Sequence, residues 1–235
     1  MKRFAATALI MLFFVTGCAT MSPDKEKEAS FYYTMGVSAL NEGNVQNAFV
    51  HFQKAYQLNP HNKEIMNSLG LVYSQLEEND KARDLFLKAI AEDPNFAEAH
   101  NNLGVTYMKM ERWNDAVESF KRALANPLYP THERAFYNMG MSYYRMGNYD
   151  GAINAFKDSL RRSPAFPYPY YGLALALNKL SRFGEAAAAM SRAIELDPAY
   201  KGNRETFLDD MNERSLTAKG SDERDIRDYI EIMKY

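Results

Sequence analysis

The sequence of 235 residues has little cysteine, little tryptophan and no excess of charge of one sign. Its one cysteine excludes an internal disulfide framework and a thiolate metal cluster. A formal net charge of −2 gives no electrostatic reason to expect a nucleic-acid partner, which needs a concentrated basic surface. With 12 glycines, 9 prolines and 46% hydrophobic residues, the chain is neither collagen-like nor of low complexity.

The N-terminus carries a targeting pattern. Lys2 and Arg3 precede Phe4–Val15, an uncharged run of 12 residues that is too short to cross a bilayer, because a spanning helix takes roughly 20. Small residues and then Cys18 follow. This order resembles the lipobox of bacterial lipoproteins, which implies that residues 1–17 are a signal peptide and that Cys18 is acylated. A plain signal peptide with an incidental cysteine is the alternative.

The residues after Cys18 bear on where such a lipoprotein would reside. Ala19 follows the cysteine instead of an aspartate, and the lipoprotein sorting rule that comes with the resemblance then implies the outer membrane. Two or more acyl chains on Cys18 would anchor the chain stably. Residues 18–28 are short, polar and charged, so we expect a flexible tether there.

A period of 34 residues organises most of the remaining chain. Gly36, Gly70 and Gly104 are spaced by 34 residues, and Gly140 follows after 36. An alanine lies twelve residues after each glycine and a phenylalanine four residues further on, as Ala48, Ala82, Ala116 and Ala152 and as Phe52, Phe86, Phe120 and Phe156.

This pattern resembles the tetratricopeptide repeat. The resemblance covers 29–200 and implies an all-α fold, a right-handed superhelical solenoid of tetratricopeptide repeats with a C-terminal helical cap. Each unit holds two apolar stripes at helical spacing, and only stacking can bury them. Small residues lie where two helices approach closely, and the phenylalanine fills the space between them. The five repeats are expected at 29–62, 63–96, 97–132, 133–166 and 167–200.

Two segments depart from the period. Residues 126–132 hold two prolines and lengthen the third unit by two residues, which predicts a stiff connection that splays or protrudes. Residues 201–235 break the consensus and read as two amphipathic helices, about 203–216 and 222–234. They predict a C-terminal helical cap or a degenerate sixth repeat, two descriptions that are almost the same.

The sequence holds no constellation typical of an enzyme. The four histidines lie in two of the repeats, two in each, without ligand spacing, and we expect all of them on the surface or in the groove: His51, His61, His100 and His132. There is no nucleophile elbow and no glycine-rich phosphate loop. We therefore expect no catalytic residues, no metal, no cofactor and no small-molecule substrate. The chain reads as an interaction protein.

Function must then lie in the concave groove, which the first helix of each tetratricopeptide repeat lines. The groove positions fall three residues before the glycine and one, four and five after it. The residues that we expect to bind a partner come from these positions, with the neighbouring Asn102 added, and form an apolar and aromatic trough that contains amides: Tyr33, Val37, Leu40, Asn67, Leu71, Asn101, Asn102, Val105, Met108, Tyr137, Met141, Tyr144, Tyr171 and Leu175.

This composition predicts that the groove receives an amphipathic helix or an apolar peptide segment. Tyrosine suits such a surface because it is amphipathic, and methionine because it is adaptable. Cations are present at Lys109, Arg134, Arg145 and Lys179, but the central contacts are apolar. The alternative is that the apolar row is half-buried helix packing.

The lipobox, the repeat array and the stretch 126–140 together resemble the type IV pilus pilotin family. Its members are outer-membrane lipoproteins that face the periplasm, bring the pilus secretin to the outer membrane and promote its multimerisation. The resemblance implies a secretin subunit, or its apolar or amphipathic segment, as partner and membrane attachment through Cys18. A general periplasmic scaffold, for instance one that organises cell-wall enzymes, is the first alternative, and an enzyme acting on peptides or glycans is the second.

Overall fold

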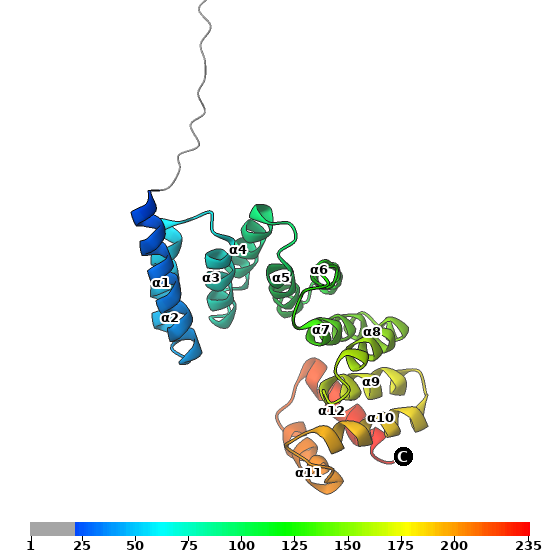
Figure 1. Cartoon of the computed structure of the whole chain (residues 1–235). Helices are drawn as coiled ribbons and strands as arrows, with labels where there is room; N and C mark the ends of the chain where they lie inside the picture. Colours follow the sequence, from blue (N-terminus) through cyan, green and yellow to red (C-terminus); the bar gives the residue numbers. More distant parts are fainter. Residues whose placement is uncertain (1–21) are drawn as a thin grey trace, which may run out of the picture.

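The structure is a computed structural model that describes residues 22–235, and these residues form twelve α-helices and no strand. The helices follow one another as six hairpins (Figure 1). We call the first helix of each hairpin the A-helix and the second the B-helix. The pairs are α1 (Pro23–Asn41) and α2 (Val45–Leu58), α3 (Lys63–Gln75) and α4 (Asn79–Glu92), α5 (Ala97–Lys109) and α6 (Trp113–Leu124), α7 (His132–Arg145) and α8 (Tyr149–Arg162), α9 (Tyr168–Lys179) and α10 (Phe183–Leu196), and α11 (Arg204–Ser215) and α12 (Gly220–Ile232).

The N-terminal helix begins earlier than the sequence indicated. Pro23 occupies the first turn of α1, where its missing N–H costs no hydrogen bond. Residues 23–28, which were expected to belong to a tether, are therefore helical. The expected signal peptide, 1–17, and Cys18 lie outside the described residues. Within residues 22–235 no helix is long and apolar enough to cross a membrane.

The glycine and phenylalanine columns meet as predicted. A Cβ atom built on Gly104 would lie 2.7 Å from Cε1 of Phe120, and the same conflict recurs in repeats one, two and four. Such a distance is far inside van der Waals contact, so glycine is what allows the A-helix to approach the ring. The four rings are fully buried, at 0% exposure: Phe52, Phe86, Phe120 and Phe156.

In each of the five repeats, the turn from A-helix to B-helix has one residue with a left-handed backbone. This residue is Gly43 in repeat one and Gly147 in repeat four, both at φ 75°. In the other three it is Glu77, Glu111 and Ser181, at φ 63°, 56° and 58°. A side chain is strained in this region, so these three turns are held by the stacked helices around them.

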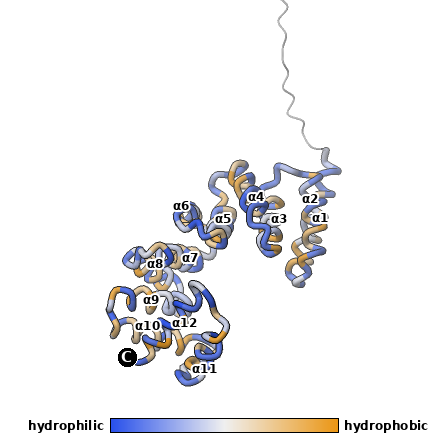
Figure 2. Tube along the Cα trace, turned by 180° about the vertical axis from the view of Figure 1, so that it is seen from behind, coloured by the Kyte–Doolittle hydropathy of each residue, from blue (hydrophilic) through white to orange (hydrophobic). Residues whose placement is uncertain are grey.

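The hairpins stack into an arc (Figure 1), and hydrophilic and apolar stretches alternate along the trace (Figure 2). The last hairpin leaves this regular stacking. The A-helix α11 touches α10 only lightly, and α12 packs against α9 and α10. The apolar core of repeats four and five therefore continues into the last hairpin through Phe207, Met211, Ile226 and Ile232.

The connection at 126–132 and the histidines differ from expectation. Leu128 is 87% exposed, but Tyr129 is buried in the core of the middle repeats, so the connection is anchored at its centre. His100 and His132 are buried, contrary to the prediction of surface or groove positions. The ring Nε2 of His100 lies 2.9 Å from the carbonyl oxygen of Pro94, a local contact that the repeat pattern did not reveal.

Candidate functional site: a concave groove half closed by the last helix

The groove residues on α1, α3 and α5 form an open trough. Most of their side chains are half-buried, and Asn67 is buried: Tyr33, Val37, Leu40, Asn67, Leu71, Asn101, Asn102, Val105 and Met108. We call this set the open trough. Within residues 22–235 the last helix packs against α9 and α10 and not against these three A-helices, and α7 is the next A-helix to touch them, through α5. Its apolar side chains are therefore available to a ligand.

The amides of the open trough already bond to one another. Asn101 donates from Nδ2 to Oδ1 of Asn102 at 3.3 Å, and Asn102 donates from Nδ2 to Oδ1 of Asn67 at 3.0 Å. The chain of amides leaves Oδ1 of Asn101 buried without a protein partner. A buried acceptor of this kind favours a donor from water or from a bound chain.

The groove residues on α7 and α9 lie under α12. Leu175 is 0% exposed, and Tyr144 and Tyr171 are nearly as buried. Tyr137 and Met141 are half-buried against the same core. These five positions were predicted to meet a partner protein, but an amphipathic helix of the chain itself occupies their face of the groove.

Two acidic side chains hold α12 in place. Arg145 donates from both terminal nitrogens to the carboxylate of Asp225, at 3.0 and 2.6 Å, and the hydroxyl of Tyr144 donates to the same carboxylate at 3.2 Å. One turn later, Lys179 pairs with Asp228 at 2.5 Å. Burial and the nearby carboxylate raise the pKa of Tyr144 above its usual range.

Tyrosines line a cavity of about 210 Å³ between α7, α9, α11 and α12. Tyr171 stacks on Phe207 with ring centroids 5.8 Å apart, and Tyr229 meets Tyr171 edge to face at the same separation. Burial raises the pKa of Tyr137 to about 12 and that of Tyr229 well above its ordinary value. The neutral phenols are part of the packing of this region.

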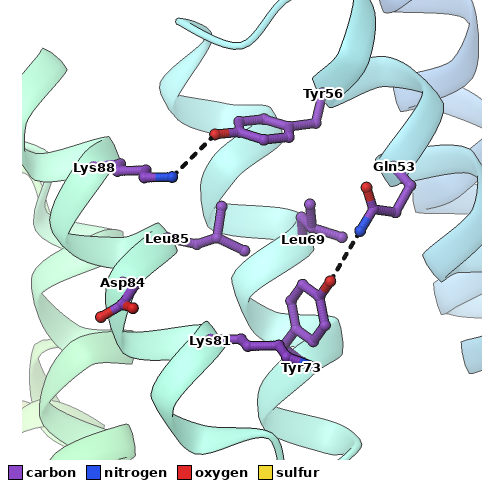
Figure 3. Close-up of a pocket in the computed structure, with 8 residues that line it drawn as sticks. All are labelled: Gln53, Tyr56, Leu69, Tyr73, Lys81, Asp84, Leu85 and Lys88. Carbon is purple, nitrogen blue, oxygen red and sulfur yellow. Dashed lines mark hydrogen bonds between the residues drawn. The ribbon is translucent and has the colours of Figure 1, made fainter.

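A second cleft, of about 240 Å³, lies away from the predicted groove residues, between α2, α3 and α4 (Figure 3). Leu69 and Leu85 lie between its polar walls. Gln53 donates to the hydroxyl of Tyr73 at 2.9 Å, and Lys88 donates to that of Tyr56 at 3.4 Å. Its polar groups bond across the junction of two repeats, so the cleft is part of how these repeats are joined.

The decisive residues that the sequence analysis missed are Asp225, Asp228 and Tyr229. The pattern indicated an amphipathic helix over these residues but not which surface it would cover. A signal was present: Lys179, Arg145 and Lys109 recur at one position of the repeat, and the last helix carries two acids three residues apart. Among residues 22–235 no cluster of His, Cys, Asp and Glu could hold a metal ion.

Comparison with known families finds tetratricopeptide repeats along the array. Models described as tetratricopeptide repeat match residues 29–62, 95–165 and 137–201, and one described as TPR repeat matches 73–111. An uncharacterized protein of Methanocaldococcus jannaschii, MJ0572, is 34% identical over 65 residues, which are 28% of this chain and 76% of that protein.

Two solved structures share the arrangement of helices. PilF of Pseudomonas aeruginosa is 23% identical, with a TM-score of 0.68, over 90% of this chain and 99% of that one. The MamA protein is 24% identical, with a TM-score of 0.64, over 76% of this chain and 96% of that one. At these identities the similarity shows the fold, a solenoid of tetratricopeptide repeats.

Proposed function

Because the chain is a tetratricopeptide-repeat protein, and so a scaffold for binding other proteins, we propose that it acts as a pilotin of type IV pilus biogenesis. In this proposal the chain is an outer-membrane lipoprotein that faces the periplasm. It holds a secretin subunit in its concave groove and promotes the localisation and multimerisation of that secretin.

The observation that carries the proposal is the extent of the similarity to PilF. It spans 90% of this chain and 99% of that protein, so it includes far more than one generic repeat. The N-terminal pattern that ends at Cys18 supports the membrane anchor, since a short uncharged run after two basic residues is a secretory signal. The apolar open trough supports binding of an apolar or amphipathic segment.

The proposed mechanism combines the membrane anchor at Cys18 with the binding groove. Acyl chains on Cys18 would carry the protein to the membrane, with two or more chains needed for stable attachment. The groove would shield an apolar secretin segment from water until the subunits assemble, because exposed apolar segments aggregate. Deletion of the gene should then remove secretin multimers from the outer membrane and leave monomers elsewhere in the envelope.

The test compares deletion strains complemented with the wild-type chain or with Cys18→Ala. Wild type should restore the multimers, and Cys18→Ala should leave them reduced or mislocalised, while both chains capture the monomer in solubilised extracts. Normal secretin multimers together with altered wall hydrolysis in the deletion strain would instead favour the general periplasmic scaffold and overturn the pilotin proposal.

A further inference from the structure

A row of basic residues runs along one edge of the concave groove. Lys109, Arg145 and Lys179 are the last residues of α5, α7 and α9, the A-helices of repeats three, four and five. A cation at the end of a helix complements the helix dipole, which accounts for one such residue in isolation. Asn41 and Gln75 hold the same place in the first two repeats, so the row begins at repeat three.

The last helix shows how two residues of this row bind an acidic helix of the chain itself. Arg145 binds Asp225 and Lys179 binds Asp228, two acids spaced by one helical turn. The apolar side chains of Ile226 and Ile232 are buried against the repeats. The groove thus receives an amphipathic helix whose acids meet the basic row and whose apolar face meets the A-helices.

Lys109 is the member of the row that α12 does not reach. Its Nζ donates to the carbonyl oxygen of Ser74 at 2.7 Å and to the Ser74 hydroxyl at 3.0 Å. Among the residues from 22 to 235, none offers a carboxylate within ion-pairing distance of Lys109, whose side chain is exposed. An ammonium has three N–H donors, so two are used by Ser74 and one is left for a further acceptor.

The surroundings of Lys109 match those that α12 covers in the next repeats. Val105 and Met108 lie on the same helix and Leu71 on the neighbouring A-helix, all half-buried in the open trough. The Oδ1 atom of Asn101, also on α5, is buried without a donor. Apolar side chains beside an unpaired cation are the same combination that Arg145 and Lys179 present to α12.

We propose that the open trough binds an amphipathic helix of a partner protein that resembles α12: an acidic side chain pairs with Lys109, and apolar side chains cover Leu71, Val105 and Met108. This inference rests on the proposed function in one respect, that the concave groove is the binding surface, and it adds the chemistry of the segment bound there. The partner helix lies beside α12 in the same groove and does not replace it, because α12 belongs to the core of the C-terminal repeats.

The probe for this site is a peptide with the sequence of residues 220–235, labelled with fluorescein. A staple between positions 223 and 227, which are exposed in α12, keeps it helical. Fluorescence anisotropy should show saturable binding to the full chain, and Lys109→Glu should weaken it by about tenfold or more. Lys121→Glu is the matched control, since Lys121 is exposed on the B-helix α6, and it should leave the affinity unchanged.

A charge exchange makes the test specific. A peptide with Asp225→Lys and Asp228→Lys should bind the wild-type chain poorly and recover binding on the Lys109→Glu chain. The inference is overturned if the peptide does not bind, or if Lys109→Glu and Lys121→Glu bind it equally. A secretin that the wild-type and Lys109→Glu chains capture equally well would leave the proposed function in place and still overturn this inference, so the two fail separately.

Discussion

Arg145 at the end of α7 and Asp225 in α12 form a two-point ion pair that closes one half of the groove, across eighty residues of sequence. The side chains are only 17% and 11% exposed. Asp225→Ala would leave the guanidinium largely buried without a counter-charge. We expect it to lower the free energy of unfolding by about 3 kcal/mol, measured by urea denaturation.

The control for this variant is Glu223→Ala on the same helix, which removes an exposed pair with Arg227. Glu223→Ala should lower the free energy of unfolding by less than about 1 kcal/mol, because solvent screens an exposed pair. If Asp225→Ala costs no more than Glu223→Ala, the ion pair does not hold α12 in the groove.

The glycines of the A-helices give a second prediction. Gly104→Ala would place a methyl group 2.7 Å from the ring of Phe120 and should destabilise the fold by about 1–3 kcal/mol. Gly184→Ala in α10 meets nothing within 4 Å and should be neutral or stabilise the fold by up to about 1 kcal/mol. Thermal unfolding of the two variants measures the difference, and equal midpoints would refute the account of close packing.

The left-handed turns offer a route to greater stability. Glu77→Gly or Glu111→Gly should relieve a strained φ of 63° or 56°. Each should raise the free energy of unfolding by about 0.5–1 kcal/mol, since the strain relieved outweighs the extra freedom of glycine in the unfolded chain. Glu92→Gly, at the end of α4, should lower it instead. A loss of stability in both turn variants would contradict the prediction.

The buried tyrosines predict sensitivity to alkali. Burial raises the pKa of Tyr137 to about 12, against about 10 in the unfolded chain. Because the pKa of Tyr137 is higher in the folded state than in the unfolded state, its contribution to stability is complete below about pH 10. This contribution is lost as the pH rises toward about 12. Between about pH 9.5 and pH 11.5, the free energy of unfolding of Tyr137→Phe should therefore fall by about 1–2 kcal/mol less than that of the wild type. If the free energies of unfolding of the wild type and of Tyr137→Phe, measured by urea denaturation, change with pH in parallel, Tyr137 does not have this role.

The repeating part of the fold could be predicted from the sequence because its cause is local and recurs. Gly70 and Phe86 must meet in a helical hairpin, and a glycine and a phenylalanine recur at the same spacing in repeats one to four. The position of α12 is a different kind of property. It depends on the ion pair between Asp225 and Arg145 and on the contact between Tyr229 and Tyr171. Each of these contacts occurs once, so no sequence period reveals it.

The same distinction applies to the groove. The apolar row on the A-helices was predicted at every repeat, since position within the repeat fixes which face a residue joins. Whether that face is open depends on the last helix, which covers Leu175 and leaves Leu71 accessible. The residues that distinguish the two halves lie outside the repeats.

The proposed function assigns the binding of a secretin subunit to the open trough of α1, α3 and α5. The most direct measurement is the affinity of the purified full chain for that subunit, compared between Leu71→Asp and Leu128→Asp. Leu128 is 87% exposed on the connection before α7 and serves as the matched control. With both variants folded by circular dichroism, the account predicts a loss of about tenfold or more for Leu71→Asp alone, because a charge would enter the apolar contact. Equal affinity of the two variants and wild type would contradict it.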